Sequence, residues 1–528
     1  MALGRTTSAA LVGVDSALVG VEADIGPGLP GYSLVGLPDA SLHESRDRVR
    51  AAIVNSGRSW PDRRITVGLS PADLPKSGSH FDLAVALAIL GAARLVDLRP
   101  TANAVLLGEL GLDGRVRPVR GVLPALLGAV RAGRERALVP EGNLREARLV
   151  TGLDVIGVSS LAEVIARLNG DPLPEPGVDA ADATDAGPVS LTASADAAAA
   201  AAFAAGGTLD LADVAGQAEG RFAVEVAAAG GHHVSLLGPP GVGKTMLAER
   251  LPGLLPDLDL DQALEVAAIR SVAGLLGSGG GLSVLPPFSA PHHTATIAAL
   301  VGGGARLPRP GAVSLAHRGV LFLDEAPEFA PAALDALRQP LERGEVVIAR
   351  AAATVRFPAR FQLVLAANPC PCGRFSGRGA DCSCPPAARR RYTTRVSGPV
   401  RDRIDIHRTL GPPSRADLRS DASTAESTDV VRGRVLAARD RQRLRLSGSP
   451  WRCNGELPGP ELRRHWTPTP EASDHLTGSL AAGSVTARGA DRIARVAWTL
   501  ADLAGVDRPG LVEVRAAGVL RGGPEAGR

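Results

Sequence analysis

The sequence predicts an α/β protein in three regions: a mixed region of strands and helices, an α/β core, and a mostly helical C-terminal region. Two observations lead to this prediction. Short apolar segments typical of strands alternate with helical segments up to about residue 410. Residues 171–208 interrupt this pattern, because they are rich in Pro, Ala, Asp and Gly and contain no Lys or Arg. Such a composition is typical of a disordered linker.

The overall composition is that of a globular chain with several domains. Its 528 residues are 45% hydrophobic and 21% charged, with a formal net charge of +3. No run of about 18 uncharged apolar residues is present, so no membrane association is expected. Asp15, Glu22 and Asp24 interrupt the apolar N-terminus, which therefore does not resemble a signal peptide. Five cysteines, an odd number, do not form the disulfide framework of a secreted protein, and we expect a cytoplasmic protein.

Periodicity predicts individual elements on both sides of the linker. Within residues 1–170, strands and helices are expected at Ala17–Val21, Ile65–Leu69, Ala104–Leu107 (strands), His43–Ser56 and Asp82–Ala92 (helices). From about residue 411 the chain is mostly helical, with an Arg-rich helix at Thr424–Leu446. A capping box from Ser423 to Glu426 is expected at the start of that helix.

The most specific motif is the loop GPPGVGKT, which lies between an apolar strand segment and a helical segment. Its glycines let backbone N–H groups surround a phosphate, and the helix N-terminus adds its dipole. Lys244 is expected to reach the terminal phosphates, and the Thr245 hydroxyl to bind Mg²⁺. Among 58 Lys and Arg residues the only other lysine is Lys76, which indicates that this loop requires an ammonium. The expected nucleotide-binding residues are Gly238, Pro239, Pro240, Gly241, Val242, Gly243, Lys244 and Thr245.

Two further strand ends supply the partners of this loop. The segment Gly319–Glu325 ends in Asp324, expected to hold Mg²⁺, and Glu325, expected to polarise the attacking water. The apolar strand Phe361–Ala367 is followed by Asn368, which suits contact with the γ-phosphate or the water. Together with the glycine-rich loop, these residues predict an ATPase that uses Mg²⁺.

Four of the five cysteines lie in one short loop with the pattern C-x-C…C-x-C. Zinc prefers four thiolates in a tetrahedron, so Cys370, Cys372, Cys382 and Cys384 are candidate ligands of a structural Zn²⁺. The spacing differs from the common C-x₂₋₄-C knuckle, and both C-x-C pairs are expected in extended chain. Free thiols or a redox-labile disulfide pair are the alternatives, and Cys453 is interpreted as structural or incidental.

The order of the three ATPase segments resembles the AAA+ ATPases, in the branch of the magnesium-chelatase motor subunits and the MCM helicases. Several longer stretches are equally specific: GLPDASLHESRDRVRAAIVNSG, LSPADLPKSGSHFDLAVALAIL, PFSAPHHTATIAALVGGG, LRQPLERGEVVIARAAATVRFPARF, NPCPCG and VSGPVRDRIDIH. On these stretches, from about residue 10 to 505, the chain is identified as a member of the ComM/YifB family of Mg-chelatase-like ATPases. The resemblance implies an AAA+ core at 209–410, with a Cys-rich loop at 370–384, and a helical lid or Mg-chelatase-like C-terminal domain at 411–528.

The resemblance also implies active sites shared between the subunits of a homohexamer. It assigns an arginine finger to Arg403, where a guanidinium reaches the ATP of the neighbouring subunit. It places a sensor-2 arginine on the lid helix Ser484–Asp502. Arg488 is the choice for that role, and Arg492 and Arg495, at helical spacing, are rivals. The alternatives are a solvated or DNA-facing cluster for Arg403 and an ordinary salt-bridged helix arginine for Arg488.

Residues 1–170 resemble the Lon protease domain without its catalytic dyad. PKSGSHFDLA aligns with the P-K-D-G-P-S-A-G motif, and His80 occupies the position of the nucleophile. GELGLDGRVRPVRGVLPALLGAVRAG aligns with the segment of the general-base lysine, where Leu123 stands. A Ser–Lys mechanism needs both groups, so no protease is expected, although Ser77, Ser79 and Lys76 lie near the lost nucleophile. Ring-forming DNA-repair ATPases also contain inactive Lon-like domains, which help to assemble the ring. The resemblance therefore implies that residues 1–170 act as a scaffold for a ring.

DNA, single-stranded or branched, is the expected substrate. The segment Gly344–Phe357 resembles the pore hairpin of MCM helicases, and its Arg350 and Arg356 are candidates for phosphate contacts. The preceding segment APHHTATIAALVGGG resembles the helix-2 insert of the same branch. Its His292 and His293 either face the pore or are ordinary polar loop residues.

Two functions from different classes remain. The ComM resemblance implies a helicase-type motor that uses ATP to drive branch migration in homologous recombination, as in natural transformation, with recombination proteins as candidate partners. The alternative is a chelatase-type motor that remodels a protein partner and does not act on DNA. The Lon-like domain favours the DNA motor, because the chelatase motor subunit is expected to lack one.

Overall fold

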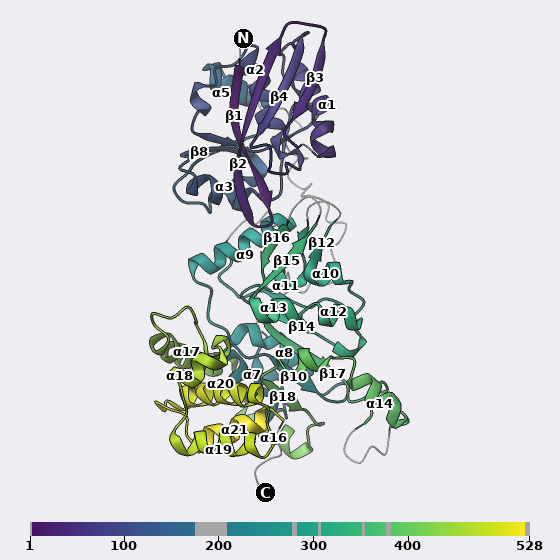
Figure 1. Cartoon of the computed structure of the whole chain (residues 1–528), viewed down its shortest axis with the longest axis vertical. Coiled ribbons are helices and arrows are strands. Elements are labelled where there is room, and N and C mark those ends of the chain that lie inside the picture. The colour runs from purple at the N-terminus through teal and green to yellow at the C-terminus, as the bar shows by residue number, and fades with distance from the viewer. Residues whose placement is uncertain are drawn as a thin grey trace.

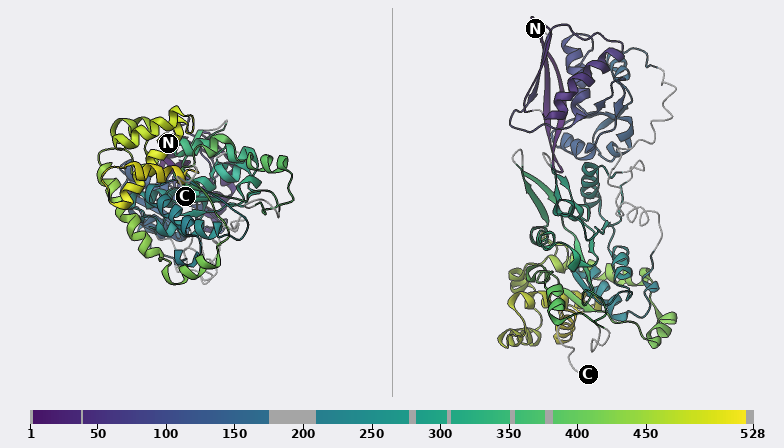
Figure 2. Two further views of the ribbon diagram at one scale, coloured as in Figure 1. Left: turned by 90° about the horizontal axis from the view of Figure 1, so that it is seen from below. Right: turned by 90° about the vertical axis from the view of Figure 1, so that its right-hand side faces the viewer.

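The computed structural model describes residues 3–37, 39–174, 209–276, 282–304, 308–350, 354–375 and 382–522. An N-terminal domain, a central region and a helical C-terminal region follow one another along the longest axis of the molecule (Figure 1). The side view shows the same stacking, with the N-terminal domain above the central region (Figure 2). Of the expected linker, residues 175–208 lie outside the described residues. Among the described helices, none combines the length and the apolar character needed to span a membrane.

The N-terminal domain contains two sheets and the helices that pack on them. The four-stranded sheet has the order β1 (Leu3–Val12), β2 (Asp15–Gly26), β4 (Arg64–Ser70), β3 (Gly31–Val35), and only its β3–β4 pair is parallel. The second sheet is parallel, with the order β5 (Ala104–Leu106), β8 (Arg136–Pro140), β9 (Asp154–Val158). The main helices are α1 (Ala40–Asn55), α2 (Asp82–Ala92), α3 (Val122–Arg131), α4 (Leu144–Ala147) and α5 (Leu161–Asn169).

Helix α2 forms the centre of this domain. Every residue of α2 except Gly91 is buried, as expected for a helix that is apolar on all sides. Strand β1 lies so close to α2 that a Cβ atom on Gly4 would lie 1.9 Å from the carbonyl oxygen of Ala88. Only glycine fits at this position. The predicted strands and helices of this region are confirmed, with α2 at the predicted residues and α1 beginning three residues early, at Ala40.

The central region is built on a five-stranded parallel sheet. Its order is β11 (Phe288–Ser289), β14 (Val320–Leu323), β17 (Gln362–Ala367), β10 (Val234–Leu237), β18 (Ile406–Thr409). The helices of this region are α7 (Ala218–Gly230), α8 (Lys244–Leu254), α9 (Leu260–Ala273), α10 (Ile297–Val301), α11 (Ala312–Leu315), α12 (Pro331–Asp335), α13 (Arg338–Arg343), α14 (Pro386–Thr393) and α15 (Gly398–Arg401). Because the strands are parallel, their carboxyl ends meet at one edge of the sheet.

Two β-hairpins project from the central region towards the N-terminal domain (Figure 1). One pairs β12 (Gly302–Gly303) with β13 (Arg309–Pro310), and the other pairs β15 (Glu345–Ala349) with β16 (Thr354–Pro358). The hairpin predicted over Gly344–Phe357 is thereby confirmed. Its turn, residues 351–353, lies outside the described residues.

The C-terminal region is helical, as predicted. Its helices are α16 (Arg415–Thr424), α17 (Thr428–Arg445), α18 (Gly459–His465), α19 (Pro470–Ala481), α20 (Ala487–Ala504) and α21 (Leu511–Leu520). The prediction of a capping box from Ser423 to Glu426 is wrong, because α17 begins after Ser427. Glu426 instead accepts two hydrogen bonds from Arg434, at 2.6 and 2.7 Å. Two guanidinium hydrogen bonds outweigh the weaker local bond that a cap would supply.

The N-terminal domain is joined to the central region through α3 and α9. Apolar side chains of α3 share one buried cluster with Ala267 and Ala268 of α9. Glu146, only 8% exposed, accepts hydrogen bonds from the Leu123 backbone N–H, at 3.0 Å, and from the Ser271 hydroxyl. A buried carboxylate that is satisfied from both sides favours one relative placement of the two helices.

A second contact lies at the turn between β1 and β2. Val12 and Val14 pack against the cluster that contains Val355 of β16. Between them, Gly13 has a φ of +72°, and a Cβ atom there would lie 2.6 Å from the carbonyl oxygen of Arg356. The N-terminal domain therefore contacts the hairpin that the sequence predicts to face DNA.

Replacing Glu146 with Ala should loosen the joint between α3 and α9. Hydrogen bonds to a charged group contribute about 1.5–3 kcal/mol, and the substitution removes the acceptor of the Ser271 hydroxyl. We expect faster amide hydrogen exchange in α3 and α9 than in the wild type, with α8 unchanged. The matched control is Glu135→Ala, at an exposed position of the same domain. Equal exchange in both variants would mean that the apolar contacts alone hold the joint.

Candidate nucleotide site and cysteine cluster

The three predicted ATPase segments meet at the carboxyl ends of adjacent strands. Strand β10 leads into the glycine-rich loop, β14 leads into Asp324 and Glu325, and β17 leads into Asn368. Strand β17 lies between β10 and β14 in the sheet, and all three are parallel. Side chains that are more than 120 residues apart in sequence, such as Lys244 and Asn368, therefore form hydrogen bonds with each other.

The glycine-rich loop has the backbone that a phosphate-binding turn requires. Gly241 and Gly243 have φ values of +79° and +90°, a region that favours glycine. Helix α8 begins at Lys244, directly after Gly243, so its N-terminal N–H groups face the loop. Gly238 is required for a different reason, since a Cβ atom there would lie 2.6 Å from the carbonyl oxygen of Leu410.

Lys244 is held at the strand ends by three acceptors. Its Nζ donates to the carbonyl oxygens of Gly238 and Pro239, at 2.6 and 2.9 Å, and to Oδ1 of Asn368, at 3.1 Å. Lys244 is only 8% exposed. Burial lowers the pKa of its ammonium group, whereas the charges of Asp324 and Glu325 raise this pKa. Three acceptors match the three donors of an ammonium group, so the charge is positioned by the fold.

A hydroxyl and a carboxylate converge beside this lysine. The Oγ1 atom of Thr245 donates to Oδ2 of Asp324, at 3.0 Å, and the other oxygen of Asp324 accepts from the backbone N–H of Glu325, at 2.9 Å. Mg²⁺ is a hard cation that prefers oxygen ligands and keeps several waters. Thr245 and Asp324 therefore fit a Mg²⁺ site that needs few protein ligands.

The structure adds a contact that the sequence analysis missed. Nδ1 of His293 lies 3.6 Å from Oε2 of Glu325, and the rings of His292 and His293 are 4.1 Å apart. The backbone of Glu325 is in the left-handed region, with φ of +49°. The parallel pairing of β11 with β14 brings this histidine and this carboxylate together. Because the two residues follow different strands, no local sequence pattern predicts their contact.

Arg403 lies in a group of arginines on α15 and its neighbours. It forms an ion pair with Glu342 of α13 and donates to the carbonyl oxygen of Pro399. Burial lowers the pKa of Arg403, and the nearby positive charges of Arg338 and Arg488 lower it further. Repulsion of this kind indicates that the fold holds several guanidinium groups together at this place.

The three candidate sensor arginines on α20 have different environments. Arg488 lies in the first turn and is exposed. Arg492 donates to the buried carboxylate of Asp405, at 2.5 Å, and to the carbonyl oxygen of Arg403, at 3.0 Å. Burial lowers the pKa of Arg495, whereas the negative charge of Asp405 raises this pKa. Arg492 therefore has a structural partner, whereas Arg488 faces solvent.

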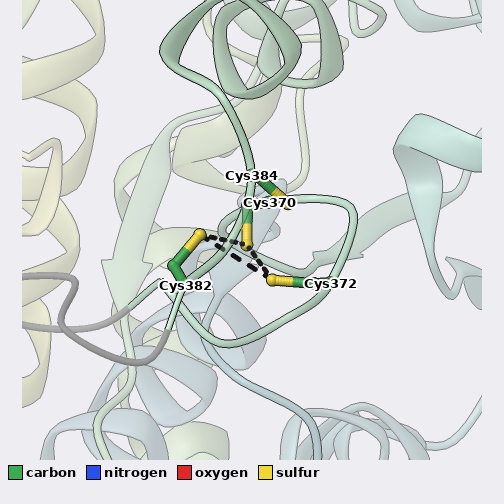
Figure 3. A group of neighbouring side chains, drawn as sticks. All are labelled: Cys370, Cys372, Cys382 and Cys384. Atoms are coloured by element: carbon green, nitrogen blue, oxygen red, sulfur yellow. Dashed lines mark hydrogen bonds between the residues drawn. The ribbon is translucent and has the colours of Figure 1, made fainter.

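The four clustered cysteines point towards one another from a single loop (Figure 3). The Sγ atom of Cys370 lies 3.3 Å from that of Cys372 and 3.6 Å from that of Cys382, and the Sγ atoms of Cys372 and Cys382 are 3.7 Å apart. With Cys384, all four sulfurs lie within 4.8 Å of one another, close to the spacing of about 3.8 Å that Zn–S bonds of 2.3 Å imply for a tetrahedron.

The expected extended geometry of the first C-x-C pair is wrong. Gly373 donates its backbone N–H to the carbonyl oxygen of Cys370, at 2.9 Å, so the chain turns at this pair, and the two sulfurs lie 3.3 Å apart. A hydrogen bond from the backbone of Arg374 lowers the pKa of the Cys372 thiol, which favours a thiolate. Residues 376–381 of this loop lie outside the described residues. Cys453 is buried elsewhere, against Gly231.

The residues of the protease-like motif have structural partners. His80 is buried, its Nε2 atom lies 2.9 Å from the carbonyl oxygen of Ala9, and burial lowers its pKa. Leu123 is fully buried in the joint between α3 and α9. Lys76 is 1% exposed and donates to the carbonyl oxygen of Pro71, and the hydroxyl of Ser79 donates to a carboxylate. Leu123, which was expected at the general-base position, therefore contributes to the packing between the domains.

The two hairpin arginines are exposed. Arg350 follows β15, and its Nε donates to the carbonyl oxygen of Gly304, at 3.3 Å, next to the other hairpin. Arg356 of β16 is 66% exposed and lies 3.4 Å from a carboxylate oxygen of Glu345. An exposed ion pair such as that of Arg356 contributes little to stability. Because both guanidinium groups are exposed, both are accessible to a ligand.

Three family models match the chain, and all describe the magnesium-chelatase subunit ChlI. "Subunit ChlI of Mg-chelatase" matches residues 21–143, "Magnesium chelatase, subunit ChlI" matches residues 210–418, and its C-terminal model matches residues 425–521. An uncharacterized protein of Mycobacterium tuberculosis is 53% identical over 98% of both chains.

Two further relatives are about 40% identical to this chain over nearly its whole length. The uncharacterized protein YifB of Escherichia coli is 40% identical over 95% of this chain and 94% of its own length. The competence protein ComM of Haemophilus influenzae is 40% identical over 96% of this chain and 94% of its own length. A Lon protease of Rhizobium meliloti shows partial similarity to the N-terminal part, with 29% identity over 31% of this chain and 22% of the protease.

Proposed function

Because this chain belongs to the family of YifB and ComM, the Mg-chelatase-like AAA+ ATPases, we propose that it is a hexameric motor that uses ATP to move single-stranded or branched DNA. The observation that carries the ATPase part is the convergence of Lys244, Thr245, Asp324 and Asn368 at the strand ends. The name of the competence relative supports the DNA part, with branch migration in homologous recombination as the reaction. Such a motor works in the cytoplasm.

Each residue of the site has one role in the proposed hydrolysis. Lys244 and the N–H groups of the glycine-rich loop hold the terminal phosphates. Thr245 and Asp324 hold Mg²⁺, which neutralises charge on the phosphoryl oxygens when it is bound. Glu325 orients the attacking water and accepts its proton, while Asn368 contacts the γ-phosphate or the water.

The hairpin of β15 and β16 supports contact with DNA. Arg350 and Arg356 are exposed, and phosphate charge dominates the affinity of proteins for nucleic acid. The same hairpin touches the turn between β1 and β2 of the N-terminal domain. A scaffold role of that domain in the ring is consistent with this contact.

The alternative, a chelatase-type motor that remodels a protein partner, has support from the descriptions of the family models. One ChlI model also matches residues 21–143 of the N-terminal domain. The presence of that domain therefore does not separate the two functions, and the choice depends on whether DNA stimulates the ATPase.

We expect Glu325→Gln to keep ATP binding and to lower kcat about 10²–10⁴-fold, because the general base is lost while the phosphate contacts remain. Lys244→Ala should instead weaken ATP binding. ATPase rates with and without forked DNA, together with fork unwinding, measure both effects. Glu328→Gln is the matched control, since Glu328 lies three residues further on and pairs with Arg395. A wild type with ATPase activity but no DNA stimulation and no unwinding would contradict the DNA motor and favour the alternative.

We further propose that Arg403 acts on the nucleotide of the neighbouring subunit, and that Arg488 is the sensor-2 arginine of the lid helix. Arg403→Ala should lower kcat by about 10³-fold or more, as for other arginine fingers. Mixing Arg403→Ala with Lys244→Ala should restore activity, because an intact finger on one subunit then faces an intact phosphate loop on the next. Arg395→Ala is the control. Inactive mixtures would contradict an action between subunits, and an active Arg403→Ala protein would assign this residue to the solvated cluster.

The cysteine cluster is proposed to hold a structural Zn²⁺. We expect about one zinc ion per chain by metal analysis of the purified protein, as in four-thiolate sites. Cys372→Ser should lose the zinc and Cys453→Ser should keep it, since Cys453 lies outside the cluster. Four titratable thiols, or a disulfide, in a protein without stoichiometric zinc would contradict this proposal and favour one of the two alternatives.

A further inference from the structure

We propose that Arg492 is a positioning residue for Arg403, through which the C-terminal region of each subunit sets how Arg403 is offered to the neighbouring subunit. This inference deepens the proposed function and rests on it for the action of Arg403 between subunits. The hydrogen bonds that hold the main chain of Arg403 do not depend on that action.

The first observation is that three consecutive residues between α15 and β18 each accept a hydrogen bond from an arginine of the C-terminal region. Arg492 of α20 donates to the carbonyl oxygen of Arg403, at 3.0 Å, and to Oδ1 of Asp405, at 2.5 Å. Arg521, directly after α21, donates to the carbonyl oxygen of Ile404, at 2.8 Å. Because hydrogen bonds from a charged donor are stronger than neutral ones, the main chain at Arg403 follows the position of α20 and α21.

The second observation is the buried carboxylate of Asp405, which is only 2% exposed. Its second oxygen lies 3.4 Å from Nδ1 of His232, and Nε2 of His232 lies 2.7 Å from Oγ1 of Thr499. Arg492 and Thr499 are seven residues apart on α20, so about two helical turns place them on one face. Asp405 is therefore linked to α20 at two points, directly through Arg492 and indirectly through His232.

The third observation concerns the side chain of Arg403. Its guanidinium group forms an ion pair with Glu342 of α13, in the central region, and the side chain is 11% exposed. The main chain of Arg403 is thus held by the C-terminal region, whereas its side chain is held by the central region. A displacement of α20 relative to α13 therefore changes the reach of the guanidinium group.

Arg508 is a matched control within the C-terminal region. It donates to the carbonyl oxygen and to the hydroxyl of Thr467, at 2.8 and 2.7 Å. Both residues follow β18 in the chain, and neither belongs to the segment that holds Arg403. Removal of Arg508 therefore deletes arginine hydrogen bonds of the same kind and leaves the contacts of Arg403 intact.

The experiment measures steady-state ATPase rates of the full-length protein, alone and in mixtures with Lys244→Ala. We expect Arg492→Ala to lower kcat about 10²-fold, since a misplacement of about 1 Å can cost that much, with the KM for ATP unchanged. Mixing with Lys244→Ala should restore activity, because that subunit supplies an intact Arg403 to the site of its neighbour. Arg492→Lys should recover part of the loss, and Arg508→Ala should resemble the wild type.

A double variant separates positioning from direct contact with the nucleotide. Arg403→Ala combined with Arg492→Ala should be no slower than Arg403→Ala alone, because Arg492 acts only through Arg403. A further loss in the double variant would overturn the inference and assign Arg492 to the nucleotide itself. Arg492→Gln keeps an amide donor for the buried carboxylate, and the same pattern is expected of it if Arg492→Ala does not fold.

The remaining outcomes also decide. A wild-type rate in Arg492→Ala, with Arg403→Ala inactive, would overturn the positioning role and leave the proposed finger standing. A slow Arg492→Gln protein that binds ATP but is not restored by Lys244→Ala would place the effect within one subunit, against the inference. If Arg403→Ala itself is fully active, the proposed action between subunits fails, and the positioning role fails with it.

Discussion

The hydrogen bonds of the buried Lys244 ammonium are the interactions on which the candidate nucleotide site depends. Two carbonyl oxygens of its own loop and the amide oxygen of Asn368 hold this ammonium. An unpaired charge at this depth would be costly, so the loop, β10 and β17 must keep their mutual register. That register also places Asp324 at the end of the adjacent β14, within hydrogen-bond distance of Thr245. The parallel sheet and the charged site therefore stabilise the same arrangement.

The N-terminal domain is tied to the central region by residues that the sequence alone interprets differently. Leu123, which the sequence aligns with the general-base position of the Lon proteases, lies in the apolar contact between α3 and α9. Its backbone N–H and the Ser271 hydroxyl share the carboxylate of Glu146. A lysine at this buried place would need its own acceptors, so an apolar residue suits the joint. The domain is thus linked to the region that carries the hairpins.

Prediction from sequence succeeded where the relevant contacts are local. The strands and the helix α2 follow from periodicity, which depends on neighbouring residues. The hairpin of β15 and β16 was expected from the resemblance to the MCM helicases, and the structure contains it. The capping box at Ser423 failed because Ser423 lies in the last turn of α16, and α17 begins only after Ser427. The turn at Cys370 escaped prediction because C-x-C alone does not specify whether the chain is extended. The gathering of four cysteines in one short loop was nevertheless sufficient to indicate a shared site.

The sequence by itself determined the residue types of the nucleotide site, since the glycine-rich loop, the two acidic residues and the asparagine each follow a recognisable strand. The tertiary structure decided which of them touch. Parallel pairing in the order β11, β14, β17, β10 brings together strand ends that are far apart in the chain. The same pairing places His293 beside Glu325. The packing of α20 leaves Arg488 exposed while Arg492 binds Asp405. Such choices depend on long-range packing, which no local pattern of residues records.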